Sequence, residues 1–519
     1  MKPDKIPADV WMEVFGHINH PQTLLNVSLA SKAFCDFAFR ALHRHLIWRK
    51  PQDAVASISV FGNNPGLQIY VRTLCVGVST LPEPLGGFIV DENGEIAQRA
   101  PGDIAGIDHT RLNNSLRYYS SEPSPLFASR ALHDSMINRI AGFASLANLT
   151  FFNVIFTHQH FTLFHSLPRL RKLHLEFCIF PLRSRSPSLD HSTLSLTELT
   201  MLNLRRRLID WNDGHHVTVE EDVTHILTLA TAHNLRTLRV DSTADVFRHV
   251  FRANTWDDRT PEYTIPVHLE RLYVQRKQLF PGKVQPMFPG EGSFPDGYCY
   301  HFLWRARSLQ TLSLCAHSDL SRAPPQDALP NLRQYAGQID SALPMAKGRR
   351  VEAFSLTFAP DVRQGLTTLA SLGRHFPDLK MLSLVMKEWE PEVIYIVSHQ
   401  FTKLRKLRIV YDIGGPNEDL VVSFGPDYFL LMPELHTVQI FSTPADHSTR
   451  AAHPKHLFDP TFNSVEEELQ NLVIPWNRFC SSLREVQLMA GYVMNRGFEG
   501  DKWKMTRVDK YDTAEDFQY

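Results

Sequence analysis

Residues 404–409 read Leu-Arg-Lys-Leu-Arg-Ile, and this short pattern recurs along most of the chain. Its unit is an apolar residue, two variable residues, a second apolar residue, one variable residue and a third apolar residue. The spacing between copies is irregular and averages roughly thirty residues, near the upper end of known repeat periods of this type. The copies, two of them weak, lie at 146–151, 170–175, 199–204, 235–240, 269–274, 309–314, 332–335, 351–356, 379–384, 404–409, 435–440 and 483–488.

The alternation within each copy predicts a short strand whose apolar side chains point inward and whose variable side chains point outward. Helix-like stretches precede several copies, for example 224–232 and 362–374. One strand and its helix cannot close a core alone, but stacked copies can. The sequence therefore predicts an α/β array in which parallel strands line a concave face and helices cover the convex face.

These copies resemble leucine-rich repeats, and the resemblance covers most of residues 67–490. It implies an irregular solenoid, or horseshoe, over residues 51–495. A general α/β protein with leucine-rich strands is the alternative. Three loop-like inserts interrupt the array at 77–125, 281–300 and 442–465, and the length of the first implies that it is functional, partly disordered or contains a short hairpin. The charged tail, 496–519, is either a capping strand or a mobile end.

The N-terminal stretch 6–48 has a different pattern, IPADVWMEVFGHINHPQTLLNVSLASKAFCDFAFRALHRHLIW. Apolar residues at helical spacing predict three short helices, with Pro7 at the start of the first. Three helices of this size cannot bury all of this apolar surface among themselves. Part of it is therefore expected to face a partner or the rest of the chain.

Ile6-Pro7, the helix after it, and the segment 24–34, LLNVSLASKAF, resemble an F-box, so residues 1–50 are identified as an F-box domain. Ile6 stands where the family has Leu, and Ala30-Ser31-Lys32 stands where it has Val-Cys-Lys. An unrelated three-helix cap is the alternative. The resemblance implies docking to a Skp-type adaptor of a cullin-RING ubiquitin ligase. The residues expected to bind the adaptor are Pro7, Val10, Val14, Ile18, Leu24, Leu25 and Leu29.

The two resemblances together are similar to F-box proteins of fungal type with degenerate leucine-rich repeats. They imply the substrate receptor of an SCF-type (Skp–cullin–F-box) ubiquitin ligase, whose repeats hold a target protein. A repeat scaffold outside any ligase is the alternative, and an enzyme hidden in the inserts is a third hypothesis. Target-binding residues are expected at the variable positions within and just after the strands: His174, Glu176, Asn203, Arg205, Arg239, Asp241, Tyr273, Gln275, Arg408 and Tyr411.

Composition narrows the class of protein further. The formal net charge of −1 argues against a nucleic-acid or membrane-surface protein driven by bulk charge. No apolar run reaches the length of a membrane-spanning helix, and the N-terminus has no hydrophobic signal core. The six cysteines are scattered without a CxxC pair, which suits a reducing compartment. Cytoplasm and nucleus are both compatible with these features.

A search for catalytic motifs finds no Gly-rich phosphate loop, GxSxG, HExxH or EF-hand pattern. The histidine groups at 158–160, 215–216 and 447–456 lack a matching Cys or carboxylate cluster at ligand spacing. We therefore expect no metal, no cofactor and no catalytic residues, and a protein that acts by binding.

Overall fold

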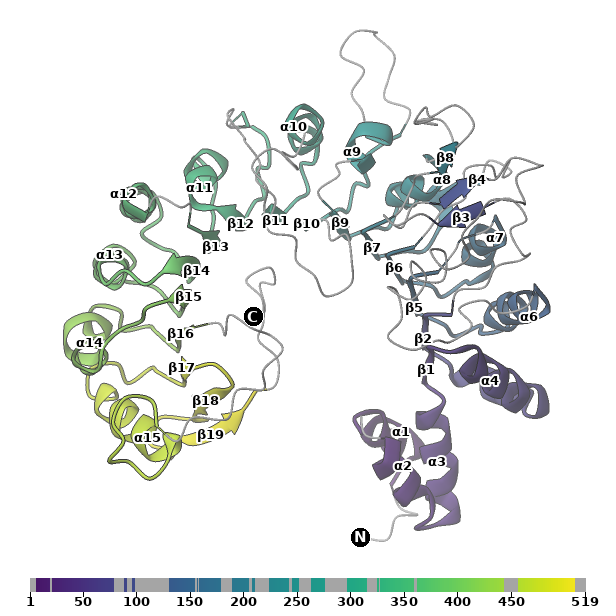
Figure 1. The fold of residues 1–519 in the computed structure, drawn as a ribbon, viewed down its shortest axis with the longest axis horizontal. Coiled ribbons are helices and arrows are strands. Elements are labelled where there is room, and N and C mark those ends of the chain that lie inside the picture. The colour runs from purple at the N-terminus through teal and green to yellow at the C-terminus, as the bar shows by residue number, and fades with distance from the viewer. Residues whose placement is uncertain are drawn as a thin grey trace. The chain divides into compact units, whose positions relative to one another are not determined.

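Strands and helices alternate along this chain and form a mixed α/β protein with a long open sheet (Figure 1). The computed structural model describes residues 6–18, 21–78, 88–90, 96–98, 130–154, 156, 158–178, 189–204, 208–210, 224–241, 245–251, 263–275, 296–314, 324–325, 327–358, 362–442 and 456–508. Within them the sheet has 16 strands in the order β1-β2-β5-β6-β7-β9-β10-β11-β12-β13-β14-β15-β16-β17-β18-β19.

The chain divides into two compact units, which are described separately. The first unit comprises Met1–Asp241, Asp245–Leu269 and Lys277–Met287, and the second comprises Ser242–Ala244, Glu270–Arg276 and Phe288–Tyr519. The structure has a strand at each copy of the repeat, so the prediction of an α/β protein is confirmed.

In the first unit, the strands of the long sheet are β1 His45–Trp48, β2 Thr73–Val76, β5 Asn148–Phe152, β6 Lys172–Glu176, β7 Glu198–Leu202 and β9 Thr237–Asp241. Its helices are α1 Ala8–Gly16, α2 Pro21–Ser28, α3 Lys32–Leu42, α4 Pro51–Asn63, α6 Arg130–Ala141, α7 His158–Ser166, α8 Thr224–Leu227 and α9 Asp245–His249, with short 3-10 turns η2 Pro65–Tyr70, η3 His191–Thr193 and η4 Thr228–Thr231. A small second sheet contains β3 Phe88–Val90, β4 Ile96–Gln98 and β8 Leu208–Asp210.

In the second unit, the strands are β10 Arg271–Gln275, β11 Thr311–Leu314, β12 Gln334–Gln338, β13 Ala353–Thr357, β14 Met381–Glu388, β15 Lys406–Ile413, β16 Thr437–Ser442, β17 Glu485–Met489, β18 Tyr492–Asn495 and β19 Lys504–Arg507. The helices are α10 Asp296–Arg305, α11 Ile339–Ala346, α12 Val362–His375, α13 Glu392–Gln400, α14 Glu418–Ser423 and α15 Val465–Trp476, with a π-turn η5 Phe424–Tyr428 and a 3-10 turn η6 Phe429–Leu431.

In the first unit, each strand of the long sheet pairs in parallel with the next one, from β1 through β2, β5, β6 and β7 to β9. The register aligns the second apolar residue of each copy. The aligned residues are Leu46, Leu74, Leu149, Leu173, Leu199 and Leu238. β1 and β2 thus extend the array toward the N-terminus, and β1 begins at His45, inside the range 1–50.

The register corrects one predicted copy. Leu173 pairs with Leu199 and Leu175 pairs with Met201, so the copy in β7 begins at Leu196 rather than at Leu199. The copy at 199–204 was therefore read three residues too late.

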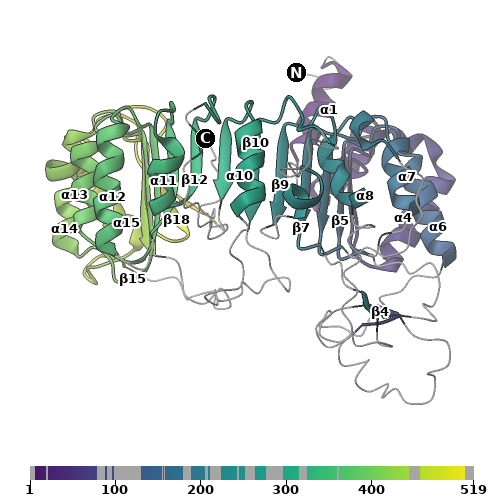
Figure 2. The ribbon, with the colours of Figure 1, turned by 90° about the horizontal axis from the view of Figure 1, so that it is seen from above.

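The second unit repeats the same arrangement from β10 to β17, with parallel pairs throughout. The aligned residues are Leu272, Leu312, Tyr335, Phe354, Leu382, Leu407, Val438 and Val486, and all are buried. Helices α11 to α15 lie on one side of strands β12 to β17 (Figure 1), and the axes of α11, α12 and α13 run side by side (Figure 2). The apolar side chains of α12 and α13 are buried against this side of the strands. We call this side the inward face of the sheet and the opposite side the outward face.

A repeated backbone contact fixes where each strand begins. The carbonyl oxygen of Lys380 accepts the N–H groups of Arg405 at 2.8 Å and Lys406 at 3.0 Å. The residue directly before the strand makes the same pair of bonds in other copies: Arg44, Arg72, Ala147, Arg171 and Thr197 in the first unit, and Glu270, Gln310, Arg333, Glu352, Arg405 and His436 in the second.

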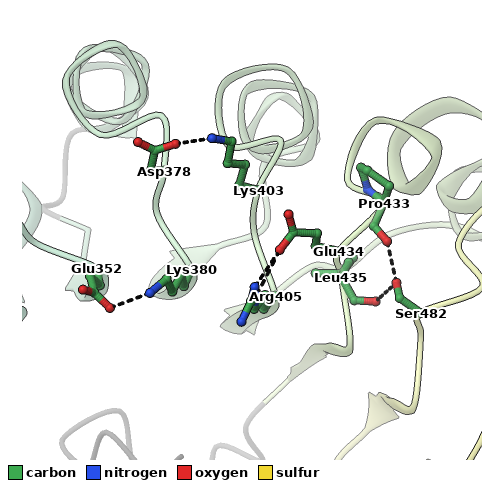
Figure 3. A network of polar contacts seen from close by, with 9 residues as sticks. All are labelled: Glu352, Asp378, Lys380, Lys403, Arg405, Pro433, Glu434, Leu435 and Ser482. Atoms are coloured by element: carbon green, nitrogen blue, oxygen red, sulfur yellow. Dashed lines mark hydrogen bonds and ion pairs between the residues drawn. The ribbon is translucent and has the colours of Figure 1, made fainter.

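Side-chain ion pairs follow the same edge of the second unit (Figure 3). Lys380 Nζ lies 2.8 Å from a Glu352 oxygen, and Arg405 lies 3.0 Å from Glu434. The Ser482 hydroxyl donates to the carbonyls of Pro433 and Leu435 at 2.7 and 2.9 Å. The ion pairs are exposed and contribute little stability, so they act mainly on register and solubility.

The inserts and the tail can be compared with their predictions where the structure describes them. In 77–125, strands β3 and β4 pair antiparallel, which agrees with a short hairpin. Residues 296–300 of the insert 281–300 belong to helix α10, so the loop prediction was wrong there. In 442–465, residues 443–455 lie outside the described residues. In the tail, β19 pairs antiparallel with β18 and ends the sheet, which agrees with a capping strand.

The repeat register predicts a large cost for shortening an aligned apolar residue. Leu382→Ala should lower the stability of the second unit by about 2–5 kcal/mol, because Leu382 is fully buried between aligned neighbours. Hydrogen exchange of the β13–β15 amides measures the loss. Thr367→Ala on the exposed face of α12 is the control and should change exchange little; equal effects of the two substitutions would contradict the register.

Candidate functional site

The three N-terminal helices form a small cluster with its own core. Phe15, Leu24, Ala38 and Ala41 are buried in it, and Trp11 packs at its margin. Some of the aromatic rings contact one another edge to face, as at Trp11–Phe34 with centroids 4.8 Å apart, and others stack, as at Phe15–Phe37. The Ser31 side chain accepts the N–H of Phe34 at 3.1 Å and so begins α3. The expected three-helix arrangement is thus present.

The outer surface of this cluster carries large apolar side chains. Val10 and Val14 are 49% and 45% exposed, and Leu25 and Leu29 are 46% and 80% exposed. Each pair is four residues apart, and Val10 and Val14 lie one turn apart on α1. Pro7, at the start of α1, is also exposed. The cluster thus leaves large apolar side chains uncovered beside a core of only four buried residues.

Two of the seven residues expected to bind an adaptor have a different environment. Leu24 is 5% exposed in the core, and Ile18 is partly buried against it. These two side chains therefore support the surface from beneath and do not form part of it. Phe39, 42% exposed on α3, is an apolar residue of the outer surface that the sequence analysis did not select.

The second candidate site is the outward face of the sheet, opposite the helices. On β6, His174 and Glu176 both face outward, and His174 Nε2 lies 3.1 Å from a Glu176 oxygen. Arg239 on β9, in the same unit, occupies the position equivalent to His174. In the second unit, Tyr273 and Gln275 face outward on β10 by the same alternation.

Arg408 also faces outward, on β15, with its guanidinium carbon 5.8 Å from the centroid of the Phe441 ring. Both Arg408 and Tyr273 are nevertheless buried. Outward-facing residues that the sequence analysis did not select include Ser383 and Gln439, the two register partners of Arg408. That these two residues lie beside Arg408 follows from the strand register, which could not be read from the sequence.

Three expected target-binding residues have structural roles or the wrong orientation. Asn203 has a positive φ of 56°, and its N–H donates to the Asp241 carboxylate at 2.8 Å. Both residues are buried, so they stabilise the turn after β7. Tyr411 was wrongly placed, because it alternates with Leu407 and Ile409 and is buried on the inward face beside Trp389. Burial raises the pKa of Tyr411. Arg205 lies outside the described residues.

Comparison with known proteins adds no identification. No protein-family model and no curated protein matches this chain. Among the described residues, no helix is long and apolar enough to cross a membrane, and no group of three or more His, Cys, Asp or Glu side chains could hold a metal ion.

Histidines instead form a buried layer between α6, α7 and η3 of the first unit. His133 is buried and its Nε2 lies 3.1 Å from Gln159 Oε1, and its ring lies 5.4 Å from that of His160. His165 Nε2 lies 3.0 Å from His191 Nδ1. Burial lowers the pKa of His133 and also that of His165. Burial therefore disfavours the charged form of His133 and His165.

The lowered histidine pKa values predict acid sensitivity of the first unit. Below about pH 6.5 the unfolded chain binds protons that the folded histidines do not bind, so stability falls as the pH decreases. We expect the urea midpoint of the first unit to fall between pH 7.5 and 5.5. His133→Gln should make that pH dependence shallower, whatever its effect on stability at pH 7.5, because His133 is one of the histidines of this unit, with His45 and His165, whose pKa is lowered. If the urea midpoint of His133→Gln depended on pH as steeply as that of the unaltered chain, the lowered pKa of His133 would be contradicted.

Leu24 and Leu25 offer a test of the cluster itself. Leu24→Ala should destabilise α1–α3 by about 2–4 kcal/mol, because it removes a core side chain. Leu25→Ala should cost about 0.5 kcal/mol or less, because its side chain is half exposed. Hydrogen exchange of the α1–α3 amides distinguishes the two, and the opposite ranking would place the core on the other side of α2.

Proposed function

We propose that this chain is the substrate receptor of an SCF-type ubiquitin ligase, with an F-box in residues 1–50 and with the strand–helix copies as degenerate leucine-rich repeats. The observation that carries the proposal is the exposed apolar surface of the N-terminal cluster. Val10, Val14, Leu25 and Leu29 expose large side chains that the small core beneath them cannot bury. A Skp-type adaptor would cover them.

Burial of such side chains provides the driving force for docking. Fully covering a Val or Leu side chain contributes about 1.5–3 kcal/mol, and these four are 45–80% exposed, so together they contribute about 3–7 kcal/mol. The cost of immobilising two proteins is about 4–15 kcal/mol, so stable association also requires contacts beyond these four side chains. A few of the four side chains are expected to dominate the affinity.

The repeat assignment is supported by a detail of the copy at 170–175. Cys178 occupies the position that follows the third apolar residue by three, where leucine-rich repeats have Asn or Cys. Its Sγ lies 3.4 Å from the carbonyl oxygen of Phe151, in the copy before, and 3.4 Å from that of Glu176. Burial raises the pKa of Cys178 to about 12, so the thiol stays protonated and can donate to a carbonyl. It links neighbouring copies in the manner expected of that position.

Under this proposal the chain performs no bond chemistry. Its contribution is proximity: a target held on the repeats has a lysine near a ubiquitin thioester carried elsewhere in the complex. A protein target is favoured because the outward face of the first unit combines both charge signs, as at His174, Glu176 and Arg239. A repeat scaffold outside any ligase remains the alternative function.

Adaptor binding tests the proposal directly. The purified chain should bind a purified Skp-type adaptor in titration calorimetry, and Val14→Asp/Leu25→Asp should weaken binding by about 100-fold or more, because each change buries a carboxylate in an apolar interface. Val55→Asp is the matched control, since Val55 is 53% exposed on α4, outside the cluster. Its binding should be unchanged.

Two outcomes would count against the receptor. Absence of binding by the unaltered chain would favour the scaffold. Equal weakening by Val55→Asp and by Val14→Asp/Leu25→Asp would place the adaptor surface elsewhere.

A further inference from the structure

The two units carry different charges at the positions where their strands begin, although the same backbone contact places these residues. In the second unit, the residue before a strand is charged at Glu352, Lys380 and Arg405, and ion pairs join these side chains to one another or to the next turn (Figure 3). In the first unit, no carboxylate occupies this position among the described residues, and four of the six residues are arginines. The six are Arg44, Arg72, Ala147, Arg171, Thr197 and Arg236.

Three arginines of this edge are exposed and lack a counterion. Arg72 precedes β2, Arg171 precedes β6, and Arg169 lies in the turn just before Arg171. Within the part of the chain that the structure describes, none of the three makes an ion pair. The neighbouring carboxylate, Glu198, is already paired with Lys172 at 2.7 Å. We call Arg72, Arg169 and Arg171 the arginine edge.

The fold does not require these charges. The contact at the strand starts uses only backbone atoms, and Ala147 and Thr197 make it in the same array. The helix dipole does not explain the charges either, because its effect falls off within the last turn of a helix and these arginines lie beyond the helix ends. Arg72 and Arg171 begin strands two positions apart in the sheet, about 10 Å, where like charges are only partly screened. We therefore expect the arginine edge to contribute nothing to folding.

We propose that the arginine edge binds an acidic segment of a partner protein. The guanidinium group presents a planar fork of N–H donors that matches a carboxylate, and charge-assisted bonds of this kind are stronger than neutral ones. An extended segment advances about 3.3 Å per residue, so about four consecutive residues cover the distance between Arg72 and Arg171. Asp or Glu side chains within such a run can each meet an arginine.

A protein segment fits this edge better than a nucleic acid does. Nucleic-acid binding draws its affinity from many phosphate contacts and from a domain with excess positive charge. This chain has a formal net charge of −1, and the arginine edge offers three positive charges. A short acidic run of a protein matches that number.

The inference goes beyond the proposed function. The arginine edge shares no residue with the N-terminal cluster, and none with the outward-facing pair His174 and Glu176. Its test therefore needs neither an adaptor nor a target, and its failure would leave the test of adaptor binding unaffected.

Fluorescence anisotropy of a labelled deca-glutamate peptide measures the binding. The full-length chain should bind this peptide at pH 7.5 in about 50 mM NaCl, whereas a labelled peptide of five Gly-Ser repeats should not bind. Raising NaCl to about 300 mM should weaken the binding of deca-glutamate at least fivefold, because salt screens contacts between exposed charges.

Charge reversal identifies the residues that bind. Arg72→Glu/Arg171→Glu should weaken the binding of deca-glutamate about tenfold or more, because two carboxylates replace two cations. Arg374→Glu/Arg478→Glu is the matched control, since both are exposed arginines of the second unit and the change in net charge is the same. The affinity of the control should be unchanged.

The urea midpoint of each variant checks the fold. It should match that of the unaltered chain, because the replaced side chains are exposed and the backbone contact is retained. If Arg72→Glu/Arg171→Glu lowers the midpoint, Arg72→Gln/Arg171→Gln replaces it and should weaken binding at least threefold.

Three results would overturn the proposal. Absence of binding by the unaltered chain would leave the arginine edge without an acidic ligand. Equal weakening by the control variant would mean that binding follows net charge. A labelled ten-nucleotide uridine RNA that binds the unaltered chain more tightly than deca-glutamate, and is lost with Arg72→Glu/Arg171→Glu, would make the edge a nucleic-acid site.

Discussion

The arrangement depends on one repeated backbone contact, in which the carbonyl oxygen before a strand accepts two N–H groups from the start of the next copy. The two donors are the residue before the next strand and the first residue of that strand. The contact therefore fixes the register between neighbouring copies to a single residue. A slip of one residue would turn every apolar side chain of a strand to the other face. The contact therefore decides which side chains form the core and which face outward.

Because the contact uses only the backbone, the residues that make it vary freely. Arg, Glu, Lys, His, Gln, Thr and Ala all occupy the accepting position. In the second unit this freedom is used for the charges of Figure 3, where Glu352 meets Lys380 and Arg405 meets Glu434. The apolar positions allow much less variation, since each is enclosed by the equivalent residues of its neighbours. This is why the repeat can be recognised from apolar spacing alone.

Apolar spacing predicted the fold class and most of the strands. It failed where the repeat pattern could begin at either of two residues. Around β7 the sequence LSLTELTMLNL places leucines at 194, 196, 199, 202 and 204, so frames beginning at 196 and at 199 both fit. Only pairing with β6 selects the first, because Leu175 lies opposite Met201. β1 escaped notice for another reason: its apolar residues continue the run of the N-terminal helices, and Trp48 reads equally well as part of a helix.

For the candidate sites, the sequence could predict which face of the sheet a residue lies on wherever its place in the repeat was known. Residues between two inward apolar positions, such as His174 and Arg408, were placed correctly by alternation alone. Tyr411 was not, because β15 continues to Ile413 and carries the inward alternation past the end of the six-residue pattern. On the helices, neighbouring residues point about 100° apart. Leu24 and Leu25 are equivalent in the sequence, and only packing against α3 buries one and exposes the other.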